Sequence, residues 1–162
     1  MSPDASAARA MAPAAENLHG YFLEDLAVGM TALFGKTVTD ADLVLFSGVS
    51  GDTNPLHLNH EFARRTHFGG PIVHGMLTAS LISTVVGTRL PGPGCIYLSQ
   101  SLRFRAPVRV GDTVEVSATI TSIVPEKRRV TLETVCRVNN TVVLDGEALV
   151  MVPSRRAPRS PA

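Results

Sequence analysis

The chain has 162 residues, of which 44% are hydrophobic, and this length and composition suit one domain with a sizeable core. Its formal net charge is +1 at pH 7, it contains no tryptophan, and only 5% of its residues are aromatic. A nearly neutral chain has little attraction for polyanions, and few rings are available for stacking on bases. We therefore expect neither nucleic acid nor a membrane surface as a partner.

The two ends differ in composition from the middle of the chain. Residues 1–18 are rich in Ala and Pro, and residues 154–162 contain mainly Pro, Ser, Arg and Ala. Such segments have little to bury, so we predict a disordered N-terminal extension over 1–18 and a disordered tail over 154–162. The folded domain is then expected over residues 19–153.

Nothing in the chain predicts export or membrane insertion. The N-terminal segment has no continuous apolar core, and the longest apolar run, residues 75–86, is shorter than the roughly 20 residues that span a bilayer. The two cysteines, Cys95 and Cys136, form no CxxC pattern and lie in apolar surroundings. We interpret them as free thiols in a reducing compartment and expect a cytoplasmic protein.

In chain order, residues 31–38 predict a strand that is interrupted at Gly35. Thr39 is the candidate N-cap of a helix that continues toward Gly51, with two aspartates in its first turn. Pro55 disfavours helix at the residue before it, so we expect residues 52–58 to form an irregular loop with an extended piece over 56–58. A short helix over 61–66 follows.

Residues 74–88 predict a second long helix whose apolar residues cover most of its circumference. Such a helix is expected to be buried nearly all round. From residue 95 onward the hydrophobic period changes to two, which predicts strands over 95–106, 113–124, 130–138 and 142–152. The turns between them are short, so neighbouring strands are expected to be antiparallel. The economical arrangement is an α+β fold in which an antiparallel sheet wraps around the long helix, with sheet edges that favour a homodimer.

Asp52 and His57 are the candidate acid–base residues. An irregular loop can bring both side chains to one point, where a carboxylate and an imidazole can move a proton through a shared water molecule. Each residue alone also has a structural interpretation, because Asp-Thr-Asn-Pro is good turn chemistry and a single histidine between leucines is commonly structural. The spacing by itself leaves both interpretations open.

Four of the five histidines fall in one segment, which raises the question of a metal site. They are His57, His60, His67 and His74. The segment has no HExxH pattern, and no second cluster of ligand residues has suitable spacing. We predict no metal and no cofactor.

Three motifs together resemble the MaoC-like hydratases of the hot-dog fold, and in particular the (R)-specific enoyl-CoA hydratases. They are D-x-N-P-x-H-L at 52–58, P-I-V-H-G-M at 71–76, and S-L-R-F-R-A-P-V-R-V-G-D at 101–112. The likeness covers residues 26–153. It implies a hydro-lyase of fatty acid or polyhydroxyalkanoate metabolism, with an acyl-CoA thioester as substrate and coenzyme A as part of that substrate.

The resemblance also implies roles for five residues. Asp52 and His57 would activate water for addition to a trans-2-enoyl-CoA, giving an (R)-3-hydroxyacyl-CoA. The backbone N–H of Gly75 would hold the developing oxyanion, with Asn54 and Ser83 near the reacting groups. The acyl tail needs an apolar slot, and for its lining we expect the neighbourhood of Met76, Leu77 and Leu81.

Several alternatives remain open at this stage. Asn54 can serve only the turn, Gly75 can simply begin a helix, and Ser83 can be a helix-packing residue. The same fold and residues suit a 3-hydroxyacyl-ACP dehydratase, whereas a non-catalytic acyl-CoA-binding subunit and a thioesterase are further functions of this fold. The candidates for contact with the phosphates of coenzyme A are Arg103, Arg105, Arg109 and the run Lys127-Arg128-Arg129, whose default interpretation is as solvated strand and turn residues.

Overall fold

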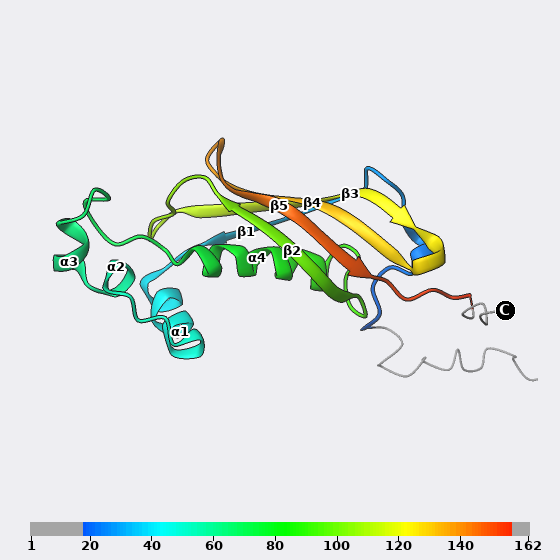
Figure 1. Cartoon of the computed structure of the whole chain (residues 1–162), viewed down its shortest axis with the longest axis horizontal. Coiled ribbons are helices and arrows are strands. Elements are labelled where there is room, and N and C mark those ends of the chain that lie inside the picture. Colours follow the sequence, from blue (N-terminus) through cyan, green and yellow to red (C-terminus); the bar gives the residue numbers. More distant parts are fainter. Residues whose placement is uncertain (1–17, 157–162) are drawn as a thin grey trace, which may run out of the picture.

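The computed structural model describes residues 18–156, which form one curved antiparallel sheet with a long helix on its inner face (Figure 1). Residues 1–17 and 157–162, where most of the two predicted disordered segments fall, lie outside the described residues. The strands are β1 (Thr31–Thr37), β2 (Ile96–Phe104), β3 (Thr113–Val124), β4 (Arg129–Val138) and β5 (Thr141–Met151). The helices are α1 (Asp40–Ser50), α2 (Pro55–Leu58), α3 (His60–Arg64) and α4 (Gly75–Thr88), with 3-10 turns at Leu23–Asp25 and Pro125–Lys127.

The sheet order is β1-β3-β4-β5-β2, and every neighbouring pair is antiparallel. Helix α4 lies along one face and contacts β1, β3 and β4. This confirms the predicted α+β fold, with an antiparallel sheet around a central helix. None of the helices between residues 18 and 156 has the length and apolar character needed to cross a bilayer.

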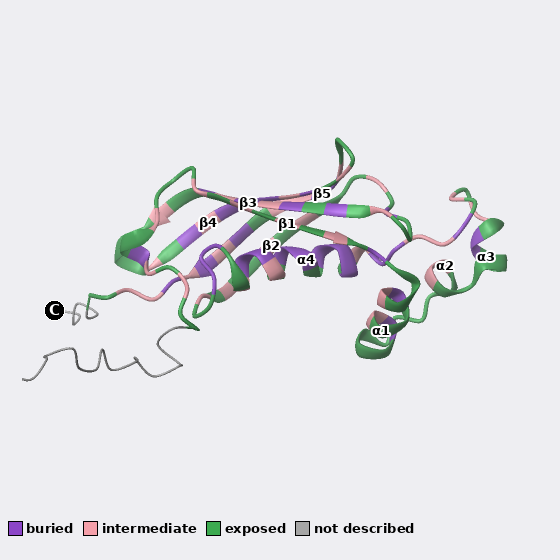
Figure 2. Ribbon diagram, turned by 180° about the vertical axis from the view of Figure 1, so that it is seen from behind, coloured by how far each residue is buried: buried purple, intermediate pink, exposed green. Residues whose placement is uncertain are grey.

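The core lies between α4 and the inner face of the sheet (Figure 2). Alternate residues of β3 and β4 point inward, as the period of two predicted. They meet apolar side chains of α4 such as Ile82, Val85 and Val86, each at most 1% exposed. Each large apolar side chain buried in this way contributes about 1.5–3 kcal/mol relative to exposure.

The prediction that α4 is buried nearly all round is wrong for the single chain. Met76 is 56% exposed, and Ser80 and Ser83 are exposed on the same side of the helix. The sheet covers only one side of α4, and the apolar residues that suggested complete burial are concentrated there. The other side carries mainly small hydroxylated residues.

Helix α1 begins and ends as its sequence predicts. Thr39 is the N-cap and forms a capping box with Asp42, whose carboxylate accepts from the Thr39 N–H at 2.8 Å. Gly51 ends the helix in the left-handed conformation, with φ 76°. The chain therefore turns sharply just before Asp52. Strand β1, by contrast, runs through Gly35 without the predicted interruption, because its pairing with β3 is continuous there.

Residues 56–58 are helical rather than extended, so that prediction is wrong. The restriction imposed by Pro55 falls on Asn54, which is indeed non-helical, and not on the residues after the proline. Proline at the first helical position is pre-organised for a helix, and the side-chain oxygen of Asn54 accepts from the Leu56 N–H at 3.0 Å. One helical turn, α2, is the result.

The start of the predicted C-terminal tail contacts the start of the domain. Ser154 donates to Glu24, and Arg155 pairs with the carboxylate of Asp25 at 2.7 Å. The Ser154 hydroxyl lowers the pKa of Glu24 to about 2, and Arg155 lowers the pKa of Asp25. Residues 154 and 155 are thereby held beside Leu23–Asp25.

Replacing Thr39 by Ala should lower the free energy of unfolding by about 1 kcal/mol, because the N-cap acceptor of α1 is lost.

The pKa of Asp42 is lowered from 3.8, mainly by the backbone N–H of Thr39. The stabilisation by Asp42 is therefore present above this ordinary value and is lost as pH falls through the lower folded value. Urea unfolding as a function of pH measures both effects. An Asp42→Asn variant should lack this acid dependence, and equal pH profiles for wild type and variant would contradict the assignment.

Candidate active site

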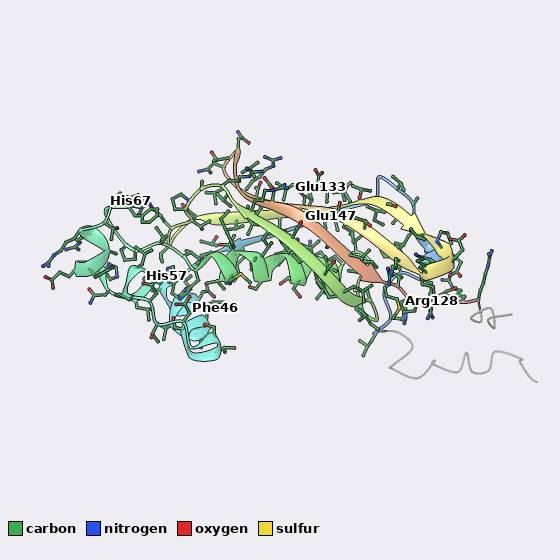
Figure 3. The ribbon with its side chains drawn as sticks, viewed as in Figure 1. Phe46, His57, His67, Arg128, Glu133 and Glu147 are labelled. Atoms are coloured by element: carbon green, nitrogen blue, oxygen red, sulfur yellow. The ribbon has the colours of Figure 1, made fainter. Side chains whose placement is uncertain are left out.

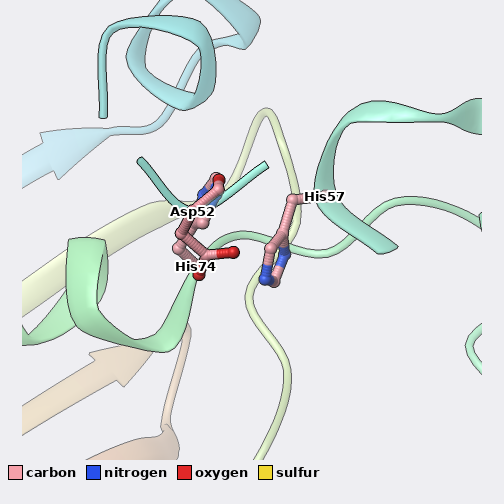
Figure 4. A group of neighbouring side chains, drawn as sticks. All are labelled: Asp52, His57 and His74. Atoms are coloured by element: carbon pink, nitrogen blue, oxygen red, sulfur yellow. The ribbon is translucent and has the colours of Figure 1, made fainter. Parts of the chain in front are cut away.

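Asp52 and His57 meet beyond the N-terminal end of α4 (Figure 4). Asp52 follows the end of α1, and its side-chain oxygen accepts from the Asn54 N–H at 3.2 Å. His57 lies on α2. One side-chain ligand atom each from Asp52, His57 and His74 lies within 4.8 Å of the others. The carboxylate and imidazole predicted from the sequence therefore stand close enough to share one water molecule.

The hydrogen bonds of His57 indicate which of its nitrogens can act as a base. Its Nδ1 lies 2.8 Å from the carbonyl oxygen of Ile72, and a carbonyl oxygen can only accept. Nδ1 therefore carries the hydrogen, and in the neutral ring Nε2 keeps a free lone pair. Nε2 is thus the nitrogen available to take a proton from water.

Gly75 is the first residue of α4, and its position suits an oxyanion donor. The N-cap residue, His74, offers no side-chain acceptor to the first turn, and the helical hydrogen bonds begin with Thr78 N–H donating to the His74 carbonyl. The first N–H groups thus point out of the helix at the positive end of its dipole. A Cβ atom at Gly75 would lie 2.8 Å from the Phe104 ring, so a larger residue here would have to displace that ring.

An apolar cavity of about 330 Å³ adjoins His57 and Gly75. Its wall is drawn from α2, the 68–73 segment, α4, the end of β2 and the start of β5. The lining residues include Phe68, Ile72, Val73, Thr78, Phe104, Arg105, Ala106, Pro107, Val108 and Val143.

The expected lining of Met76, Leu77 and Leu81 is wrong: Leu77 and Leu81 are buried in the core, and Met76 faces outward. Phe68, Phe104 and Val143 were not predicted, because they come from separate segments that meet at the cavity only in the folded chain.

Asn54 and Ser83 occupy different surroundings. The side-chain oxygen of Asn54 is used to cap α2, while the residue itself remains exposed beside Asp52. Ser83 lies about two turns along α4 from Gly75, or about 12 Å at 1.5 Å per residue. It is exposed and does not line the cavity. Within one chain, the structure thus brings Asn54 toward the pair but does not bring Ser83 there.

A second hollow, of about 570 Å³, is formed by residues of the sheet. Two of its lining residues, Glu133 and Glu147, lie on the face of the sheet away from α4 (Figure 3). The hollow is lined by polar and charged side chains, including Glu133 and Glu147, which face each other on β4 and β5. It contains none of the predicted site residues. The smaller apolar cavity is therefore the candidate substrate site.

Among residues 18–156, the group that could hold a metal ion is Asp52, His57 and His74. Their arrangement suits this poorly, because a ring nitrogen of each histidine faces a carbonyl oxygen and must carry a hydrogen; His57 Nδ1 lies 2.8 Å from the Ile72 carbonyl oxygen. The Nε2 of His74 also contacts the Asp52 carbonyl oxygen at 3.1 Å.

Comparison with known proteins identifies the family. The family described as MaoC like domain matches residues 26–144, and the chain belongs to this MaoC-like dehydratase family. It is 52% identical over 141 residues to an (R)-specific enoyl-CoA hydratase of Rhodospirillum rubrum, covering 87% of this chain and 98% of that protein. It is 54% identical over 134 residues to a 3-hydroxybutyryl-CoA dehydratase of Methylorubrum extorquens, covering 83% and 85%.

The solved structures agree with this assignment. The (R)-hydratase from Aeromonas caviae involved in PHA biosynthesis superposes with a TM-score of 0.78 at 44% identity, covering 80% of this chain and 99% of that one. The hot-dog fold that the motifs implied is thereby confirmed.

Purified protein should contain well below one metal ion per chain, because His57 Nδ1 and His74 Nε2 face carbonyl oxygens as hydrogen-bond donors and cannot at the same time bind a metal. Elemental analysis by plasma mass spectrometry measures this directly. Zinc or iron at one ion per chain, lost together with activity on chelation, would contradict the prediction.

Proposed function

We propose that the protein is an (R)-specific enoyl-CoA hydratase, which reversibly adds water to trans-2-enoyl-CoA to give (R)-3-hydroxyacyl-CoA. The observation that carries this proposal is the meeting of Asp52 and His57 beside the first turn of α4 and an apolar cavity. The printed activities of the similar hydratase and dehydratase proteins support it. Because hydration and dehydration are the two directions of one equilibrium, both names describe the same chemistry.

The acid–base pair has two tasks in this reaction. A water molecule held between the Asp52 carboxylate and the His57 Nε2 loses a proton to the pair as its oxygen bonds to Cβ of the enoyl group. The electron pair of the double bond moves toward the thioester, and Cα takes up a proton from the pair. The water supplies both the added hydroxyl and one proton, so the pair ends in its starting state.

Negative charge develops on the thioester oxygen during the addition. The Gly75 N–H is suited to hold that charge, since it lies at the first turn of α4 and has no side-chain cap as competitor. Removing one such donor typically costs about 3 kcal/mol of transition-state stabilisation. Asn54 beside the pair is proposed to contact the substrate, and Ser83 is proposed to act only where the assembled protein brings it near a bound acyl chain.

We further propose a cytoplasmic homodimer. In the single chain, α1 exposes Val44, Leu45 and Val49, which is 89% exposed, and Met76 is exposed on α4. The outermost strands, β1 and β2, each leave one edge unpaired in the described sheet. A second copy of the chain can cover these apolar residues symmetrically. The free thiols Cys95 and Cys136 are consistent with a reducing compartment.

Mixing the protein with crotonyl-CoA should lower the enoyl absorbance until the hydration equilibrium is reached, and chiral analysis should identify (R)-3-hydroxybutyryl-CoA as the product. The same assay with the matched carrier-protein thioester separates a coenzyme A enzyme from a carrier-protein dehydratase. A thiol reagent detects free coenzyme A and so identifies thioesterase activity. Binding of crotonyl-CoA without turnover, or an (S) product, would contradict the proposal.

The variants Asp52→Asn and His57→Ala should each lower kcat by about 10²- to 10⁴-fold, since each removes one half of the proton-transfer pair. Circular dichroism should show that both variants stay folded. Asp40→Asn and His60→Ala are matched controls, because these exposed residues lie outside the site and the substitutions should leave kcat unchanged. Wild-type rates in either site variant would remove that residue from the mechanism.

Light scattering during gel filtration should give twice the mass of one chain. Val49→Asp should shift the protein toward monomer, because it places a charge in the proposed apolar contact, whereas Glu126→Gln in an exposed turn should not. A monomeric wild type at micromolar concentration would contradict the dimer proposal.

A further inference from the structure

We propose that His74 is a positioning residue, a neutral imidazole that holds both members of the acid–base pair; this inference rests on the proposed hydratase function. His74 is 1% exposed and is the N-cap of α4. It does not line the cavity, so it does not touch substrate there. Its ring instead lies against Phe46, Asp52 and His57.

The contacts of His74 assign its tautomer. Its Nε2 lies 3.1 Å from the carbonyl oxygen of Asp52 and 3.3 Å from the hydroxyl oxygen of Ser47. The carbonyl oxygen can only accept, and the Ser47 hydroxyl already gives its hydrogen to the Leu43 carbonyl at 2.8 Å. Nε2 must therefore be the donor to both oxygens.

The other ring nitrogen of His74 carries no hydrogen. Nδ1 is buried and has no hydrogen-bond partner among residues 18–156. A hydrogen there would be a buried donor without an acceptor, at the positive end of the α4 dipole. The α1 side chains that contact the ring, Phe46 and Ser47, carry no charge, and its titratable neighbours are Asp52 and His57. These surroundings favour a neutral ring with Nε2–H.

A neutral His74 can serve both catalytic partners at once. Its Nε2–H tethers the backbone of Asp52, which restricts where that carboxylate can point. Its aromatic face lies 3.9 Å, centroid to centroid, from the ring of His57. When His57 takes a proton from water it becomes a cation, and a neutral aromatic face stabilises a neighbouring cation. A protonated His74 would repel it.

Two variants separate the tether from the aromatic face. His74→Gln keeps an N–H donor near Nε2 but loses the ring, and His74→Phe keeps a ring but loses the donor. We expect each to lower kcat for crotonyl-CoA hydration by about 10- to 100-fold through misplacement of the pair, with KM nearly unchanged. The acid limb of the pH–rate profile should move to lower pH in His74→Gln, where the His57 cation loses its aromatic neighbour. It should stay in place in His74→Phe.

A purely structural role of His74 would not move the acid limb of the pH–rate profile in His74→Gln while leaving it in place in His74→Phe. Wild-type kcat in either variant, or losses that only follow the folded fraction measured by circular dichroism, would overturn the proposal.

Ring ¹⁵N NMR of the wild-type protein tests the proposal even if both variants fail to fold. The expected spectrum shows His74 with its ring hydrogen on Nε2 and none on Nδ1. An imidazolium or an Nδ1–H tautomer would refute it. A wild type without hydratase activity would remove the proposed function but leave the tautomer test intact.

Discussion

A short segment, Ile72 and Val73, ties the loop that carries the acid–base pair to the core of the domain. The Val73 N–H donates to the Val108 carbonyl at 2.7 Å, and Val73 is 3% exposed. The preceding carbonyl, that of Ile72, accepts from His57 Nδ1 at 2.8 Å. The position and tautomer of His57 thus depend on a backbone segment that is anchored to the connection between β2 and β3. The same segment leads directly into His74 and Gly75.

Because of this connection, the site combines a buried scaffold with an exposed reacting group. Helix α4 is held against the sheet by its buried face, which fixes where its first N–H groups point. Asp52, by contrast, is exposed and lies on a loop between α1 and α2. The buried His74 ring joins these two parts. A buried helix with an exposed loop beside it suits a reaction that needs a fixed oxyanion donor together with access for water and substrate.

The local features of the fold could be predicted from the sequence because local rules determine them. The period of two placed β3 at the residues that the structure assigns to it, 113–124, and the capping pattern at Thr39 placed the start of α1. The short turns correctly predicted the antiparallel order of β3, β4 and β5, but the same rule wrongly made β2 a neighbour of β3, because β2 crosses to pair with β5 at the other side of the sheet. The extended piece predicted over 56–58 is instead the helical turn α2, because the restriction imposed by Pro55 acts on Asn54 and not on the residues after the proline. Gly35 suggested an interruption that pairing with β3 overrides.

The parts of the site that escaped prediction depend on contacts between distant segments. Phe104 covers Gly75 from a strand that begins some twenty residues later, and Val143 reaches the cavity from β5. No periodicity in the sequence encodes these contacts. The close contact between the rings of His57 and His74 is likewise visible only in three dimensions, because the spacing of the two residues in the sequence does not indicate it.

The central claim is that Asp52 and His57 act as one unit on one water molecule. Single-turnover hydration of crotonyl-CoA by wild type, both single variants and the Asp52→Asn/His57→Ala double variant tests it most directly. Residues that act as a unit show strongly non-additive losses, so the double variant should be about as slow as the slower single variant. Losses that multiply, as for independent groups, would contradict this account.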